Sequence, residues 1–163
     1  GDEWKQLTDE AGTHWIRPML EIAVESGMRQ GEIHSLEWKH IDFDKSLIGI
    51  WRKDKRSVGG KKWHIIPMWR GVREALLRVS NETGKGSTVF CVKRSSSISD
   101  KFARMCTKLD IVNLRFHDLR HEAITRMFED RKMSVEQVRL VSGHSSLDQL
   151  SRYVNLRPED LVD

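Results

Sequence analysis

The sequence predicts a single, mainly α-helical domain with a small antiparallel β-hairpin. Apolar residues recur at helical spacing through most of the chain, which is typical of amphipathic helices. That period is lost in one place, where two β-prone runs, 47–52 and 63–66, flank a basic stretch that contains Gly59 and Gly60. With 163 residues, of which 38% are hydrophobic and 32% charged, the chain has the length and composition of one folded domain.

The first helix is expected over residues 13–26. Thr13 suits the N-cap, Pro18 falls near the first turn where its missing N–H costs least, and Gly27 suits a left-handed helix stop. A short helix is then expected to resume over about residues 30–38, just before the hairpin.

Helical spacing returns after the hairpin. A helix is expected over residues 69–80, followed by a short strand in the run "STVFCV" at 87–92. The tryptophans near the hairpin are expected to pack against the sheet. The remaining helices are expected at about 98–109, 117–129, 134–141 and 146–155.

Composition excludes several classes of protein. The chain has no run of 18 apolar residues and its start does not resemble a signal peptide, so a cytoplasmic protein without a membrane segment is expected. Cys91 and Cys106 lack metal-ligand spacing and are expected to be free and buried. A net charge of +4 is compatible with nucleic-acid binding, and residues 51–64 hold six Lys or Arg against one Asp.

Several polar side chains stand at helix starts or loop edges, and they are candidates for a site: Arg29 with Glu32, Lys53, His117 with Arg120, and His144 with Tyr153. Tyr153 is the one tyrosine of the chain. Taken alone, each of these residues has an ordinary structural explanation. Arg29, for example, could form an ion pair with Glu32.

A metal site was considered for the stretch "HDLRH". His117 and His121 stand four residues apart, as two zinc ligands on a helix do. The zinc-protease pattern requires a glutamate after the first histidine, but Asp118 occupies that position, and Arg120 would repel a cation on the same face. No metal is therefore expected.

Together, the candidate side chains suit chemistry at a phosphate. Two arginines can hold the non-bridging oxygens of a phosphate, and a histidine can donate a hydrogen bond or move a proton. A lysine can protonate a leaving oxygen, and a tyrosine becomes a nucleophile when cations stabilise its phenolate. Because no carboxylate cluster is present to hold Mg²⁺, side chains would have to stabilise the transition-state charge.

Three stretches carry a family resemblance: "SGMRQGEIHSL", "HDLRHEAIT" and "SGHSSLDQLSRYVN". In order and spacing they resemble the signature boxes of the tyrosine recombinases, the phage-integrase family, including the nine residues from His144 to Tyr153. The resemblance covers about residues 13–157 and implies the tyrosine recombinase catalytic-domain fold. One departure is Ser142-Gly143, where the family usually has an apolar residue before the glycine.

The resemblance implies a role for each site residue. Arg29 and Arg120 would clamp the scissile phosphate, and His144 would complete the pocket. Tyr153 would attack the phosphorus to form a 3′-phosphotyrosyl bond, without a cofactor. His117 would hold the phosphate or assist proton movement, and Glu32 would orient the arginine side.

The hairpin lysine that protonates the leaving 5′ oxygen is assigned to Lys53, because it stands where the first strand ends. Its rivals are Lys55, Lys61 and Lys62. Together with Arg56, these three lysines are also candidate DNA contacts.

The resemblance also implies a partner and an assembly. Residues 1–163 are interpreted as a catalytic domain excised from a longer integrase, because the family's N-terminal core-binding domain is not recognised. The expected partner is double-stranded DNA with attachment-type sites, bound as a homotetramer by the full-length protein, whereas the isolated domain would be a monomer.

The expected function is site-specific recombination of a phage or mobile element. A chromosome-dimer resolvase, a type IB topoisomerase and a non-catalytic DNA-binding module with the same fold remain alternatives. A phosphate-binding protein or small phosphatase is less consistent with the sequence, because no Cys or Ser nucleophile motif is present.

Overall fold

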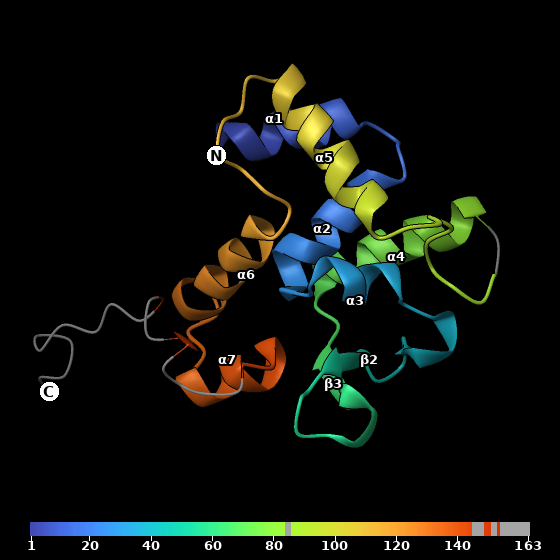
Figure 1. Ribbon diagram of the computed structural model, residues 1–163, viewed down its shortest axis with the longest axis vertical. Helices are drawn as coiled ribbons and strands as arrows, with labels where there is room; N and C mark the ends of the chain where they lie inside the picture. The colour runs from blue at the N-terminus through green and yellow to red at the C-terminus, as the bar shows by residue number, and fades with distance from the viewer. Residues whose placement is uncertain (84–85, 145–148, 151–152, 154–163) are drawn as a thin grey trace, which may run out of the picture.

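The computed structural model describes residues 1–83, 86–144, 149–150 and 153. Most of the elements are helices, and a small antiparallel sheet lies at one side of them (Figure 1), which confirms the predicted fold class. The helices are α1 (Asp2–Ala11), α2 (Ile16–Ser26), α3 (Gln30–His34), α4 (Arg70–Thr83), α5 (Ser96–Lys108), α6 (Asp118–Glu129) and α7 (Val135–Ser142). The strands are β1 (Ile41–Asp42), β2 (Leu47–Lys53) and β3 (Lys61–Pro67), and single 3₁₀ turns lie at Trp38–His40 and Val58–Gly60.

Helix α2 forms the centre of the core. Its side chains Met19, Leu20, Ile22 and Ala23 are at most 1% exposed and belong to a broad buried face. A broad apolar face must be covered by neighbours, and α2 packs against α4 and α6, with α1, α3 and α5 completing the cover (Figure 1). Because α2 is so enclosed, its C-terminal end is a fixed point from which a site can be built.

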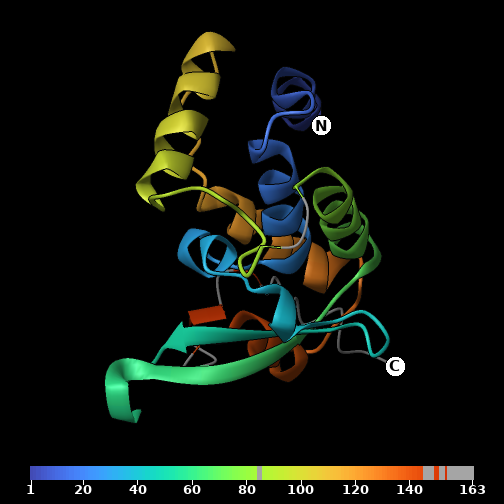
Figure 2. The same ribbon diagram turned by 90° about the vertical axis from the view of Figure 1, so that its right-hand side faces the viewer.

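The sheet has the order β1-β2-β3, and both pairs are antiparallel. In Figure 2 the hairpin of β2 and β3 extends along one side of the molecule, away from α1 and α5. Ile48 and Ile50 point inward and are buried, whereas Trp51 and Trp63 pair on the outer face. A two-residue period is what a strand with one buried face requires.

The outer face holds Trp63 close to the backbone. A Cβ atom on Gly49 would lie 2.1 Å from Cζ2 of Trp63, so the indole needs a glycine on the opposite strand. Trp51 remains 53% exposed and contacts Trp63 edge-on, with 5.0 Å between ring centroids. Trp69 packs instead under the guanidinium of Arg131, 3.9 Å from the ring centroid. Trp51 and Trp63 thus pack against each other on an exposed surface, and Trp69 packs against the core, so the expectation for the tryptophans holds only in part.

Two helices begin differently from the sequence prediction. Helix α1 was not predicted, because its surface is mostly charged and only Leu7 and Ala11 are buried. Asp2 and Glu3 stand in its first turn, where carboxylates suit the helix dipole. Helix α2 begins at Ile16 rather than at Thr13, and no side chain caps it.

The predictions for the strand at 87–92, for the two cysteines and for the helix at 146–155 have different outcomes. Residues 87–92 are not a strand, because they contribute only an isolated bridge between Thr88 and Glu37. Cys106 is buried as expected, but Cys91 is exposed. The helix expected at 146–155 lies mostly outside the described residues. Among the residues that are described, no helix is both long and apolar enough to cross a membrane.

Candidate active site

Arg120 lies in the first turn of α6 and is only 3% exposed. Its Nη1 donates to the carbonyl of Gly27 at 2.6 Å, and its Nη2 donates to the carbonyl of Ser142 at 2.8 Å. These carbonyls stand at the C-terminal ends of α2 and α7, where helix carbonyls lack partners and attract a cation. One guanidinium group thus joins three helices at the base of the site.

Arg29 and Glu32 form the edge of the site next to Arg120. Gly27 ends α2 with a left-handed φ of 73°, as predicted, and Arg29 follows as the N-cap of α3. The backbone N–H of Arg29 donates to Oε1 of Glu32 at 2.9 Å, and its Nη1 lies 3.4 Å from Oε2. The Arg29 side chain is 43% exposed, whereas that of Glu32 is 7% exposed. Glu32 therefore holds an arginine that still reaches solvent.

Arg52 is a member of the site that the sequence prediction missed. It continues the inner face of β2 after Ile48 and Ile50, and its side chain is 2% exposed. Its Nε donates to Oε2 of Glu32 at 3.2 Å, and its Nη1 donates to the carbonyl of Val141 at 2.5 Å. The signal was available, because an arginine in phase with two buried isoleucines on a strand is a candidate buried charge.

His144 is placed by the residues just before it. The hydroxyl Oγ of Ser142 lies 2.7 Å from Nδ1 of His144 and accepts from its backbone N–H at 3.4 Å. Gly143 ends α7 with a φ of 73°, and a Cβ there would lie 2.7 Å from Nη1 of Arg52. The serine that departs from the family pattern is thus the residue that holds the histidine.

Tyr153 contacts α6 through His121, which is not among the site residues predicted from sequence. Its hydroxyl is hydrogen-bonded to Nδ1 of His121, and the two rings are stacked with centroids 5.9 Å apart. One turn earlier on α6, His117 meets His121 edge-on at 5.1 Å. The tyrosine therefore lies beside the helix that carries Arg120, on the histidine side of the site.

The hairpin lysines differ in the face on which they lie. Lys53 and Lys61 are paired opposite each other, in phase with Trp51 and Trp63 on the outer face. Lys62 is paired directly with Arg52, so it projects from the same face as that arginine. Lys55 and Arg56 belong to the exposed turn.

Charge in this site is unbalanced. The guanidinium groups of Arg29 and Arg52 contact the carboxylate of Glu32, and that of Arg120 lies near enough to interact with the same charge. Three positive charges thus face one negative charge. Burial and then the charges of Arg29 and Arg52 lower the pKa of Arg120 to about 9, so it stays protonated at neutral pH at a cost. Burial, with His121 and the nearby arginines, also lowers the pKa of His117. The net positive charge of Arg29, Glu32, Arg52 and Arg120 therefore favours the binding of an anion at this site.

Most of the predicted site residues lie together, and they come from the start of α3, the start of α6 and the chain after α7. The residues so connected are Arg29, Glu32, His117, Arg120, His144 and Tyr153. Lys53 is exposed on the outer face of the hairpin. Among the described residues, no three His, Cys, Asp or Glu side chains are grouped as metal ligands would be.

The chain matches known proteins along almost its whole length. Residues 1–160 match the sequence model of the Phage integrase family. The shufflon-specific DNA recombinase of Escherichia coli is 34% identical over 144 residues, which are 88% of this chain and 35% of that protein. The chain therefore spans about a third of the length of that relative.

Solved structures share the fold. The crystal structure of XerA recombinase matches 99% of this chain and 61% of its own, with a TM-score of 0.76 and 20% identity. The Tn1549 transposon integrase in complex with circular intermediate DNA matches 97% of this chain and 60% of its own, with a TM-score of 0.74 and 19% identity. The family match over nearly every residue, together with this shared fold, shows that the chain belongs to the phage integrase family.

Proposed function

We propose that this chain cuts and rejoins DNA strands at specific sites through a covalent bond between Tyr153 and a 3′ phosphate. The observation that carries the proposal is that this tyrosine lies close to a cluster of side chains in which three arginines face one carboxylate. Membership in the family and the recombinase activity named for the Escherichia coli relative support the same reaction.

The arginines are suited to different parts of phosphate binding. Arg29 is partly exposed and keeps N–H groups that can reach a non-bridging oxygen, since a guanidinium carries five donors. Arg120 gives two of its donors to the carbonyls of Gly27 and Ser142, which fixes its plane before any substrate arrives. His144, held by Ser142, completes the contacts to the phosphate. Such preorganised donors lower the barrier because they need not reorient as charge develops.

Proton transfer completes the reaction. The oxygen of Tyr153 attacks the phosphorus, and its proton passes to His121, its hydrogen-bonded neighbour. The bond from phosphorus to the 5′ oxygen breaks, and that oxygen takes a proton from a hairpin lysine. Lys53 was assigned this role from sequence, but Lys62 shares the face of Arg52, so we propose Lys62 as the donor. Rejoining is the same sequence in reverse with a new 5′ hydroxyl, and the phosphotyrosyl bond conserves the energy of the cut bond.

The partner is double-stranded DNA, by likeness to the integrase that was solved with circular intermediate DNA. The exposed cations of the hairpin turn, Lys55, Arg56 and Lys61, are placed to contact phosphates. Because the chain spans about a third of its first relative, the assembly is proposed for the whole protein: a homotetramer on two DNA sites.

A covalent-adduct assay tests the function. DNA that carries the recombination site of the encoding element is incubated with the protein in EDTA and without ATP, and the reaction is stopped with SDS. The parent should form a protein–DNA adduct, and Tyr153→Phe should form none while binding the same DNA. Binding by both without an adduct in either would favour a DNA-binding module over an enzyme.

A further inference from the structure

Arg52 is a buried charge to which the proposed reaction gives no task. It lies on β2, yet both of its hydrogen bonds leave the sheet: one goes to Glu32 on α3 and the other to Val141 on α7. Its third nitrogen group, Nη2, is buried and has no hydrogen-bond partner among the described residues. Burial lowers its pKa more than the carboxylate of Glu32 raises it. A buried arginine at this position needs an explanation. An apolar side chain would extend the core of Ile48 and Ile50 without the desolvation penalty of a charge.

The contacts of Arg52 join three parts of the site, which are strand β2, Glu32 on α3 and the end of α7. Oε2 of Glu32 receives both Arg52 and Arg29, so the position of one guanidinium sets the room left for the other. The carbonyl of Val141 stands one residue before Ser142, which binds Arg120 and His144.

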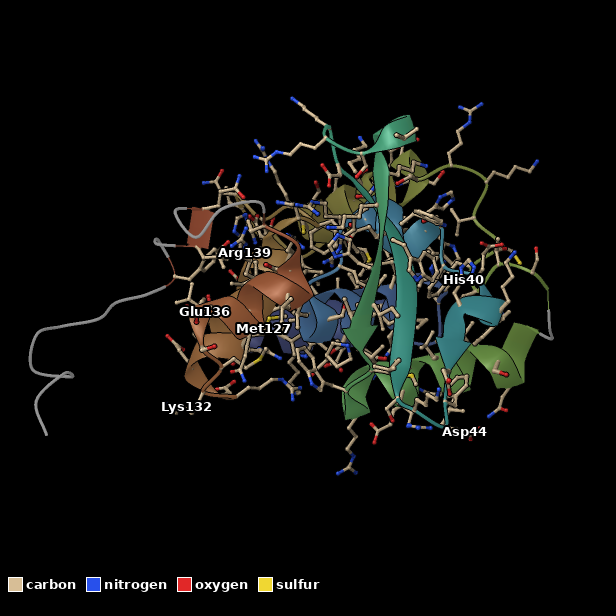
Figure 3. All side chains as sticks on the ribbon, turned by 90° about the horizontal axis from the view of Figure 1, so that it is seen from below. His40, Asp44, Met127, Lys132, Glu136 and Arg139 are labelled. Atoms are coloured by element: carbon tan, nitrogen blue, oxygen red, sulfur yellow. The ribbon has the colours of Figure 1, made fainter. Side chains whose placement is uncertain are left out.

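Glycine at position 143 is the counterpart of this arrangement. A Cβ there would lie 2.7 Å from Nη1 and 3.0 Å from Cδ of Arg52, so the turn before His144 is packed directly on the guanidinium. Figure 3 shows from below that the hairpin runs beside α7, the helix that carries Glu136 and Arg139. The side chain of Arg52 therefore fills the space between hairpin and helix at the level of the site.

We propose that Arg52 is a positioning residue that locks the hairpin strand, Glu32 with Arg29, and the end of α7 with His144 into one geometry. The inference rests on the proposed cleavage reaction. In the proposed reaction Arg52 makes no contact with the phosphate, because its Nε and Nη1 are bound to Glu32 and Val141 and its Nη2 is buried. It acts by fixing the groups that do and by holding Lys62, its partner on β3, at a set distance from them.

The charge of Arg52 gives this arrangement a second property. With the carboxylate of Glu32 shared between two arginines, the cations of the pocket are incompletely neutralised until an anion arrives. A bound phosphodiester, and then the doubly negative transition state, supply the missing charge. The locked geometry is thus stabilised most when the reacting phosphate is present, which is the condition for lowering the barrier rather than only tightening binding.

The test compares Arg52→Gln, Arg52→Lys and Glu32→Gln with the parent and with Arg70→Gln. Arg70 is the matched control, since it is also paired with a glutamate but is 91% exposed. Single-turnover cleavage by Arg52→Gln should fall about 100-fold, as expected when reacting groups are displaced by about 1 Å. Its dissociation constant for DNA should stay within about threefold of the parent, because phosphate contacts at the edge remain. Arg52→Lys should recover part of the rate, and Arg70→Gln should match the parent.

The double variant Glu32→Gln, Arg52→Gln keeps the proposal testable if a single variant unfolds. Removing both members of this ion pair takes away one positive and one negative charge, so the net charge of the site is unchanged and the double variant should fold. Its cleavage rate should be no lower than that of the slower single variant. Its urea midpoint should fall by less than the sum of the falls measured for the two single variants. Additive effects on both quantities, or parental cleavage by folded Arg52→Gln, would overturn the proposal. A parent that forms no adduct while the midpoints still show coupling would instead contradict the proposed function.

Discussion

The site has a buried base and an open rim, and the two are built differently. At the base, Arg52 and Arg120 are at most 3% exposed and donate to backbone carbonyls at helix ends. At the rim, Arg29 is 43% exposed and has one long contact to Glu32. Arginines with the same charge therefore have different tasks in the proposed reaction: those of the base set the geometry when the chain folds, and that of the rim meets the substrate.

The largest effect is expected from removing the base. Arg120→Met leaves the carbonyls of Gly27 and Ser142 without a donor inside the protein, which should cost about 2–5 kcal/mol of stability. Cleavage per folded molecule should also fall by about 10²–10³-fold, because the guanidinium that fixes the preorganised site is lost. Urea unfolding and single-turnover cleavage measure the two effects. A variant that loses activity but keeps the parental unfolding midpoint would show that Arg120 does not hold the helices together.

Arg29→Gln should separate the rim from the base. Cleavage should again fall by about 10²–10³-fold, but the unfolding midpoint should stay near that of the parent, because the side chain is partly exposed and its ion pair is long. Arg17→Gln serves as the control, since Arg17 is also a partly exposed arginine paired with a glutamate. A drop in stability as large as that of Arg120→Met would abolish the distinction between rim and base.

Variants of the hairpin lysines test which face of the sheet supplies the proton to the 5′ oxygen. Lys62→Ala should slow cleavage by about 100-fold if it supplies the proton to the 5′ oxygen, whereas Lys53→Ala should have a smaller effect. A substrate with sulfur in place of the bridging 5′ oxygen identifies the donor, because a thiolate leaves without a proton. Only the variant that lacks the donor should recover its rate on this substrate. Recovery by Lys53→Ala instead would restore the assignment made from sequence.

The same contrast explains which parts could be predicted from sequence. Arg29, Arg120, His144 and Tyr153 stand in stretches with distinctive spacing, and the helix stop at Gly27 follows from local backbone preferences. These features depend on neighbours in the chain, and they carried most of the site.

Contacts between distant segments could not be predicted in this way. Arg52 stands in the run "WRKDKR", which suggested exposed DNA contacts, and only its phase with Ile48 and Ile50 marks it as buried. His121 meets Tyr153 from 32 residues away, which requires the folded path of the chain. Helix α1 was missed because two buried side chains give too weak a period.

The smallest effect is expected from pH, and it belongs to the rim. The pKa of His117 lies below its ordinary value of 6.5 because of burial and the cations around it, so the unfolded chain takes up this proton first. As pH falls below about 6.5 toward the folded pKa, this histidine should therefore subtract stability, and His117→Asn should lose less on acidification. A bound phosphate should raise the same pKa, so DNA affinity should increase a few-fold more steeply on acidification in the parent than in His117→Asn. Urea midpoints and DNA titrations at about pH 7.5 and about pH 5.5 measure both slopes. Equal slopes in the two proteins would mean that the phosphate does not reach the histidine side of the rim, and that the arginine side alone binds it.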